Sequence, residues 1–162
     1  MTETTTRPIE PSEEKSEDGP PALPECGDSI DSTIFEQILE MDDEEEREFS
    51  RSIVYGFFEQ AVATFKKMDD GLASGDLSQL SSLGHFLKGS SATLGLTKVK
   101  DSCEKIQHYG AKKDDTGTRD EPSDDVCLRR IRDALALVRE EYNEVEKVLK
   151  RFYDSQPQPS QN

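Results

Sequence analysis

The spacing of large apolar residues near the C-terminal end constrains the fold more than any other feature of this chain. Eight of them follow one another at alternating intervals of three and four positions: Leu128, Ile131, Leu135, Val138, Tyr142, Val145, Leu149 and Phe152. This spacing places all eight on one stripe of a single long α-helix. Such a stripe needs partner helices that cover it at a shallow crossing angle, so the pattern predicts a helical bundle.

Four segments upstream show the periodicity of amphipathic helices, and capping signals mark several of their ends. The expected helices run from about Thr33, which forms a capping box with Glu36, to Met41; from about Glu45 to Ala73; from Asp76 as N-cap to Gly95 as the terminating glycine; and from Thr97 as N-cap to about Ala111. A polar loop over Lys112–Ser123 precedes the last helix. Because no segment alternates as a strand does, we expect an all-α antiparallel four-helix bundle with an additional short N-terminal helix.

The two ends of the chain differ in composition from this helical part. Residues 1–28 are rich in Pro, Glu, Ser and Thr, and residues 155–162 contain Pro157 and Pro159. Such segments bury too little apolar surface to offset their ordering entropy, so we expect a disordered extension and tail around a domain of residues 29–154. Residues 1–48 hold 17 acidic and 3 basic residues of a chain with net charge −15, which leaves the helical part nearly neutral.

Charge and cysteine usage argue against several classes of protein. An acidic chain without a basic stripe is not expected to bind nucleic acid or an anionic membrane. The three cysteines, Cys26, Cys103 and Cys127, have no C-x-x-C spacing, so neither a disulfide framework nor a metal site is expected. The longest strongly apolar run, Ile53–Phe58, is too short to cross a bilayer, and no signal peptide is recognisable. We therefore expect a soluble intracellular protein.

The third expected helix carries the residue best suited to chemistry, His85. At 100° per residue the leucines of this helix form one narrow stripe, and His85 points away from it into solvent. The residues that share its outward face are Ser81, Lys88, Gly89 and Ala92. A glycine costs about 1 kcal/mol in a helix interior. Its position beside an exposed nucleophile is best explained by a partner that must approach closely.

An exposed histidine next to a lysine suits phosphoryl transfer. Neutral imidazole is available as a nucleophile near pH 7, and the reaction needs mainly positioning and charge neutralisation, which Lys88 can supply. A lone helical histidine is more often structural, as for His108, which lacks a lysine three positions later and a glycine four positions later. The chain has no Gly-rich phosphate loop and no room for an ATP-binding domain. A phosphoryl donor and its metal must therefore come from a partner protein.

The segment His85–Gly95, H-F-L-K-G-S-S-A-T-L-G, resembles the motif H-x-[LF]-K-G-[SA]-[SA] of the histidine-containing phosphotransfer (HPt) domain family. Leu83–Leu96, Glu104–Gln107 and Thr33–Asp43 resemble, more narrowly, the fungal phosphorelay members of that family that serve osmosensing. The resemblance covers roughly residues 30–153. The chain departs from the budding-yeast pattern in a longer acidic N-terminal extension and a shorter loop at 112–123.

This resemblance implies a role for each matching residue. His85 would accept a phosphoryl group from an aspartate in the receiver domain of a hybrid sensor histidine kinase and pass it to an aspartate of a response regulator. Lys88 would stabilise the phosphate, Gly89 would leave room for the receiver's loops, and Gln107 would hydrogen-bond near the histidine. The expected docking surface comprises Ile34, Ile38 and Met41, with Ser81 and Ala92 beside the histidine.

The resemblance also implies the setting of the protein. Magnesium would belong to the receiver, so no cofactor is expected on this chain, and the protein would be a monomer of the cytoplasm and nucleus in osmotic-stress signalling. Two other interpretations were weighed: a helical adaptor that binds receivers without being phosphorylated, and the dimerisation helix pair of a histidine kinase. The intact His85 and Lys88 argue against the first, and the lack of a neighbouring ATPase domain argues against the second.

Overall fold

The computed structural model describes residues 29–42 and 47–154; the disorder expected at 1–28 and 155–162 concerns residues outside this part. The helices of the described residues are α2 (Ser32–Leu39), α3 (Glu48–Ser74), α4 (Leu77–Leu94), α5 (Thr97–Gly110) and α6 (Asp124–Asp154). The described part contains no β-strand, only an isolated antiparallel bridge between Lys113 and Asp120 in the α5–α6 loop. The expected all-α architecture is confirmed.

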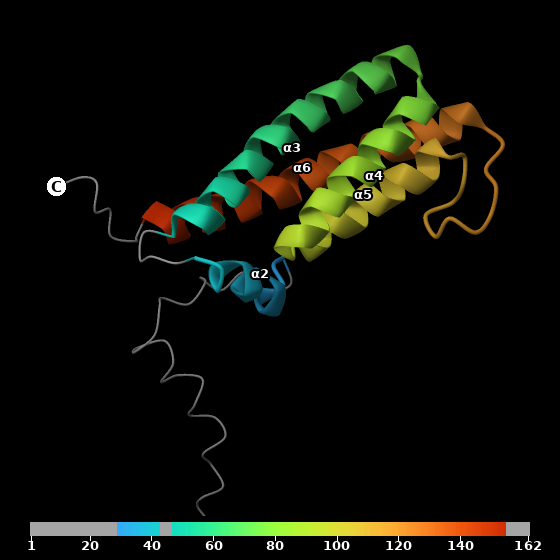
Figure 1. Cartoon of the computed structure of the whole chain (residues 1–162). Coiled ribbons are helices and arrows are strands. Elements are labelled where there is room, and N and C mark those ends of the chain that lie inside the picture. Colours follow the sequence, from blue (N-terminus) through green and yellow to red (C-terminus); the bar gives the residue numbers. More distant parts are fainter. Residues whose placement is uncertain (1–28, 43–46, 155–162) are drawn as a thin grey trace, which may run out of the picture.

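Helices α3 to α6 run alternately up and down and form the bundle (Figure 1). α3 and α6, with 27 and 31 residues, extend beyond the shorter hairpin of α4 and α5 at one end of the molecule. The short helix α2 lies at that end and contacts both α4 and α3. None of the described helices is long and apolar enough to cross a membrane.

The apolar stripe of α6 lies at the centre of the core, as its spacing predicts. Seven of its eight residues are at most 3% exposed, and the eighth, Leu128, is partly buried. The ring of Tyr142 packs against three rings of α3, those of Phe57, Phe58 and Phe65, with centroids 5.5 to 6.1 Å apart. Each fully buried large apolar side chain stabilises the fold by about 2 kcal/mol, so α6 and α3 supply much of the cohesion of the bundle.

The ends of the helices agree with the sequence in part. The Asp76 carboxylate accepts a hydrogen bond from the Gln79 amide, and Gly75 and Gly95 end their helices with φ of 71° and 77°. The capping box expected at Thr33 is wrong, because the Asp31 carboxylate caps α2 instead, 3.0 Å from the Thr33 amide nitrogen.

Two further boundaries differ from expectation. Leu96, not Thr97, is the N-cap of α5, so the threonine lies inside the first turn. The start expected for the second helix at Glu45 lies outside the described residues, and the described helix begins at Glu48. Neither difference changes the order or the direction of the helices.

Two glycines let α4 and α5 approach each other at backbone distance. A Cβ added to Gly84 on α4 would lie 2.8 Å from both the Cys103 carbonyl oxygen and the Gln107 nitrogen of α5. A Cβ added to Gly110 on α5 would lie 2.6 Å from the Ser81 nitrogen of α4. Since those neighbours are backbone atoms, they cannot rotate away. The register of α4 on α5 is therefore fixed at these two points.

We expect Gly84→Ala to lower the free energy of unfolding by about 2 kcal/mol, because the added methyl group overpacks a backbone contact. Gly89→Ala, five residues later on the same helix, is the matched control. A Cβ at Gly89 meets no heavy atom within 4 Å, so alanine there should raise the free energy of unfolding by up to about 1 kcal/mol through helix propensity. Urea unfolding followed by circular dichroism measures both; equal effects would contradict the close approach at Gly84.

Candidate functional site

Helix α4 presents His85 to solvent, as the leucine stripe predicts. Leu80, Leu87 and Leu94 are buried beneath the helix, whereas His85 lies on its exposed side. Leu83 is only partly buried at the edge of the core. The imidazole therefore lies on the solvent side of a helix whose opposite side packs into the core.

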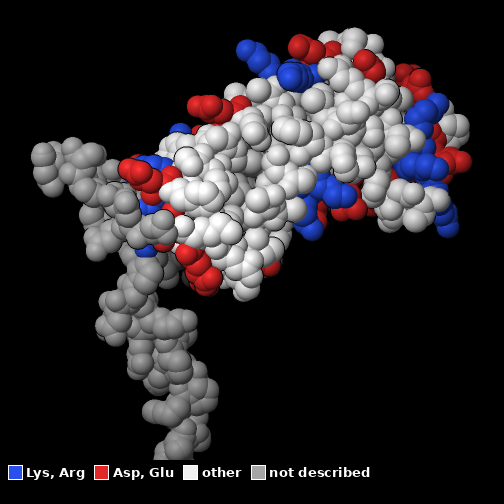
Figure 2. All heavy atoms as spheres, in the orientation of Figure 1, with Lys and Arg blue, Asp and Glu red and all other residues white. Residues whose placement is uncertain are grey.

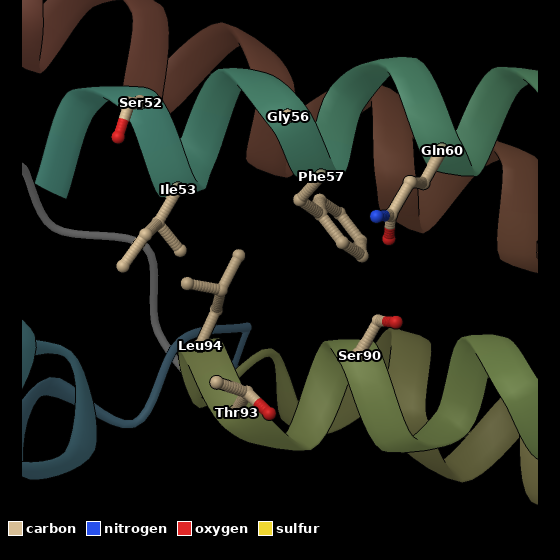
Figure 3. A pocket seen from close by; sticks show the side chains of 8 residues that line it. All are labelled: Ser52, Ile53, Gly56, Phe57, Gln60, Ser90, Thr93 and Leu94. Carbon is tan, nitrogen blue, oxygen red and sulfur yellow. The ribbon is translucent and has the colours of Figure 1, made fainter.

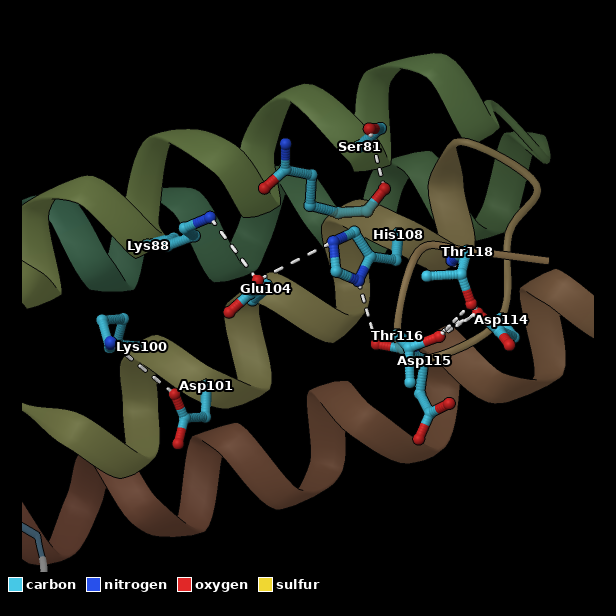
Figure 4. Close-up of polar contacts among 11 residues, drawn as sticks. Ser81, Lys88, Lys100, Asp101, Glu104, His108, Asp114, Asp115, Thr116 and Thr118 are labelled. Carbon is cyan, nitrogen blue, oxygen red and sulfur yellow. Dashed lines mark hydrogen bonds and ion pairs between the residues drawn. The ribbon is translucent and has the colours of Figure 1, made fainter. Parts of the chain in front are cut away.

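Lys88 lies one turn beyond His85 and leans toward α5. Its Nζ lies 3.9 Å from Oε2 of Glu104, and its side chain is 32% exposed (Figure 4). The pairing with Glu104 was not foreseen in the sequence. Both α4 and α5 carry lysines, so the sequence alone does not show which lysine Glu104 contacts. The way in which the two helices cross decides it.

The surface beyond His85 is open. Gly89 and Ala92 are exposed, and the space above Gly89 is empty to at least 4 Å. This excludes the alternative that Gly89 serves to admit a neighbouring helix among the described residues. Phe86, next to His85, is 49% exposed and adds an apolar side chain that the sequence reasoning did not single out.

Ser81 makes a hydrogen bond between helices. Its hydroxyl donates a hydrogen bond of 2.9 Å to the Gln107 carbonyl oxygen of α5, and the residue is only partly exposed (Figure 4). The expectation of a docking role for Ser81 did not take this contact into account. Helix α5 crosses α4 here because Gly84 admits its backbone.

Gln107 reaches the vicinity of His85 through that crossing. A Cβ on Gly84, the residue directly before His85, would lie 2.8 Å from the Gln107 backbone nitrogen. The amide oxygen of the Gln107 side chain is buried and has no hydrogen-bond partner among the described residues. A buried acceptor without a partner is costly. The Gln107 side chain therefore keeps a free acceptor on the segment of α5 that meets the backbone of the residue before His85.

The residues expected to form the docking surface on α2 differ in their exposure. Phe35 and Ile38 are buried, Ile34 is partly buried against Gly95, and Met41 is 60% exposed. Ile38 therefore belongs to the core, and its expected exposure is wrong. At the end of the bundle the Phe35 ring packs edge-to-face on the Phe152 ring. This contact turns the side of α2 that carries Phe35 toward the core.

An open groove of about 330 Å³ runs between α3 and α4, beginning about one and a half turns beyond His85 (Figure 3). Its walls are Ser52, Ile53, Gly56, Phe57 and Gln60 from α3 and Ser90, Thr93 and Leu94 from α4. Figure 2 shows that charged side chains gather at the margins of this face of the molecule and leave its middle mostly uncharged. This surface can accept a partner without burying charges.

The remaining titratable groups near the site offer no competing chemistry. Burial, with a smaller effect of Glu141, raises the pKa of the Cys103 thiol to about 12, so the thiol behind Gly84 is not a nucleophile near neutral pH. Within the described residues no group of three His, Cys, Asp or Glu side chains is arranged to hold a metal ion. The imidazole of His85, in contrast to the Cys103 thiol, is exposed.

Comparison with known proteins agrees with this geometry. A family model described as the Hpt domain matches residues 53–141, more than half of the chain. The chain belongs to the Hpt-domain family. This family carries phosphoryl groups on histidine as an intermediate of a phosphorelay, so the domain is a relay intermediate and not a self-contained enzyme.

Individual relatives are fungal phosphorelay proteins. The chain is 47% identical over 125 residues to the multistep phosphorelay regulator 1 of Schizosaccharomyces pombe, covering 77% of this chain and 42% of that protein. It is 33% identical over an alignment of 171 residues to the phosphorelay intermediate protein YPD1 of Candida albicans, covering 77% of this chain and 92% of that protein. The match thus spans less than half of the first relative and nearly all of the second.

A solved structure supports the fold and bears on partners. The complex of Saccharomyces cerevisiae Ypd1 with the receiver domain of its downstream response regulator Ssk1 matches with a TM-score of 0.69 at 31% identity. The match covers 84% of this chain and 98% of that phosphotransfer protein.

The packing role of Ser81 can be tested. We expect Ser81→Ala to lower the free energy of unfolding by about 1 kcal/mol, the net value of one intramolecular hydrogen bond. Well below the unfolding temperature the rate of phosphoryl transfer should change by less than about twofold, because the hydroxyl is already engaged by the Gln107 carbonyl oxygen. Denaturant titration and a transfer assay measure the two effects; a large loss of transfer with unchanged stability would restore the docking role.

Proposed function

We propose that His85 carries the phosphoryl group, accepting it from a receiver-domain aspartate of a hybrid sensor histidine kinase and passing it to a receiver-domain aspartate of a response regulator. The observation that carries this proposal is the exposed imidazole on α4, with Lys88 on the same side and open space above Gly89. All three lie within two turns of one helix. A partner can therefore bring an aspartyl phosphate in line with the ring from solvent.

The chemistry of each transfer balances without a further reagent. A ring nitrogen of His85 attacks the phosphorus, the bond between phosphorus and the aspartate oxygen breaks, and its electron pair stays on the carboxylate. The imidazolium formed releases its ring proton to water, and the reverse sequence delivers the group to the next aspartate. Lys88 offsets negative charge on the transferred oxygens. Magnesium would be held by the receiver, whose acidic residues suit that ion.

Receiver domains are the proposed partners on both sides of the relay. The solved complex of the yeast relative with a receiver domain supports this class of partner. On this chain the proposed docking surface combines the uncharged face around the α3–α4 groove with the exposed residues Met41, Phe86 and Ala92. Ile34 contributes only the exposed part of its side chain to this surface. Ile38 is buried and supports α2 from the core side.

The remaining parts of the proposal rest on the sequence resemblance to fungal phosphorelay proteins alone. We place the protein in the cytoplasm and nucleus, as a monomer that serves osmotic-stress signalling. A receiver-binding adaptor without phosphorylation is disfavoured, because nothing in such an adaptor would require an exposed imidazole beside a lysine.

Incubation with a phosphorylated receiver domain tests the carrier role. We expect the protein to acquire an acid-labile, alkali-stable label and His85→Gln to acquire none, because glutamine has no nucleophilic ring nitrogen. His108→Gln is the matched control: it leaves His85 as the only histidine of the chain and should reach the same final extent of labelling. Label on His85→Gln, with its helicity intact by circular dichroism, would assign the phosphate to another residue.

Substitution at Gly89 tests the close approach of the receiver. We expect Gly89→Gln to slow transfer by about tenfold or more, since a displacement of about 1 Å from the productive geometry can cost about a hundredfold. The protein itself has room for the side chain, so stability should not fall. Ala136→Gln, at an exposed position of α6, is the control. Stopped-flow transfer rates decide, and equal rates in both variants would refute the close approach.

A further inference from the structure

The carboxylate of Glu104 faces two basic side chains at once. Its Oε2 lies 3.9 Å from Lys88 Nζ on α4 and 3.8 Å from His108 Nε2, one turn further along α5 (Figure 4). Neither distance is that of a tight hydrogen bond. Both contacts are therefore electrostatic, and the carboxylate can shift from one partner to the other.

The α5–α6 loop fixes the direction of the His108 ring. Its Nδ1 lies 2.9 Å from the Asp115 carbonyl oxygen, and a carbonyl only accepts, so Nδ1 carries a proton and donates. Gly117, at φ of 78°, lies against the ring: an added Cβ would be 2.8 Å from Nε2. The loop thereby holds Nε2 toward Glu104.

The α5–α6 loop keeps the same shape at pH values near neutrality. The Asp114 carboxylate accepts hydrogen bonds from the Thr116 hydroxyl and from the amides of Thr118 and Arg119. The hydrogen bond from the Thr116 hydroxyl, opposed by desolvation and aided by the amides, lowers the pKa of Asp114 to about 2. The carboxylate thus stays charged and the loop closed across the physiological range.

We propose that Glu104 is a positioning residue that acts on His85 through Lys88 and keeps the phosphorylated histidine poised for onward transfer. In the unphosphorylated chain Glu104 holds Lys88 on the α5 side of the imidazole. A phosphoryl group on His85 must compete with Glu104 for that lysine and is repelled by the carboxylate. The inference rests on the proposed role of His85, and it adds that the stability of the phosphohistidine is set from α5.

The loop also orients the proton of the His108 ring away from Glu104. The Nδ1 proton is donated to the Asp115 carbonyl oxygen, so Lys88 is the side chain that can donate to the Glu104 carboxylate. Lys112, the next basic residue along the chain, is engaged by Asp124 at 2.7 Å.

The lifetime of the phosphohistidine tests the proposal without any receiver. The full chain is labelled with phosphoramidate, a small phosphoryl donor to histidine, and hydrolysis is followed by phosphorus NMR; the signal of His85 is the one absent in His85→Gln. Glu104→Gln is compared with the wild type, with the conservative Glu104→Asp, and with Asp101→Asn. Asp101 is the matched control: it lies one turn earlier on α5, 3.8 Å from Lys100 and not beside Lys88.

We expect Glu104→Gln to lengthen the lifetime at pH 8 by about three- to tenfold, the effect of one partly screened charge at this distance. Glu104→Asp should stay near the wild type, and Asp101→Asn should change the lifetime by less than about 1.5-fold, since its charge is more distant. In a chain that already carries Lys88→Gln, the further change Glu104→Gln should have a clearly smaller effect. A merely structural role of Glu104 would shorten the lifetime or leave it unchanged.

Two outcomes would overturn the role of Glu104. One is an equal lifetime of Glu104→Gln and the wild type at pH 8, and the other is equal lengthening of the lifetime by Asp101→Asn. Failure of a phosphorylated receiver to label the wild type would overturn the carrier function instead, and these lifetimes would still be measurable.

Discussion

The contact on which the site depends is the backbone approach of α4 and α5 at Gly84 and Gly110. A methyl group at either position would lie within 2.8 Å of backbone atoms of the other helix. Because the helices meet there without side chains between them, Gln107 comes to lie beside the residue before His85, and the Ser81 hydroxyl reaches the Gln107 carbonyl oxygen. The same crossing brings Glu104 to Lys88. The contact thus places the α5 residues that meet α4 around the position of His85.

The rest of the bundle stabilises the fold, so the outer face of α4 can remain exposed to solvent. The apolar stripe of α6 and the aromatic side chains of α3 supply the buried area that stabilises the fold, and Leu80, Leu87 and Leu94 tie α4 to them. Small residues such as Gly89 and Ala92 can then occupy the outer face, since stability does not depend on what they contact. A chain with few apolar residues can therefore form a core and still leave His85 exposed. On the proposed function, His85 is half of an active site, and a partner supplies the other half.

Properties of single helices could be predicted from the sequence, whereas relations between helices could not. The spacing from Leu128 to Phe152 indicates a bundle, and the position of His85 opposite the leucines indicates its exposure, because both follow from 100° per residue. Burial of Ile38 depends on how α2 meets Phe35 and Phe152 at the end of the bundle, and the Lys88–Glu104 contact depends on the register of two helices. The Asp31 cap was missed for a local reason, since Asp31 and Thr33 are both good N-cap residues and only the backbone decides between them.

A phosphoryl carrier must release what it accepts, and this limits how strongly its site can bind the phosphate. Each 1.4 kcal/mol of extra stabilisation of the phosphorylated state shifts the transfer equilibrium tenfold toward storage on the carrier. A lysine free to contact the phosphate would act in that direction, and nothing else in the described part of the face opposes it. A carboxylate at 3.9 Å from the same lysine offsets part of its attraction while leaving it available during transfer. If Lys88 assists the transfer as proposed, its charge is balanced by a carboxylate of the neighbouring helix. This balance suits the proposed binding of one receiver domain and then of another.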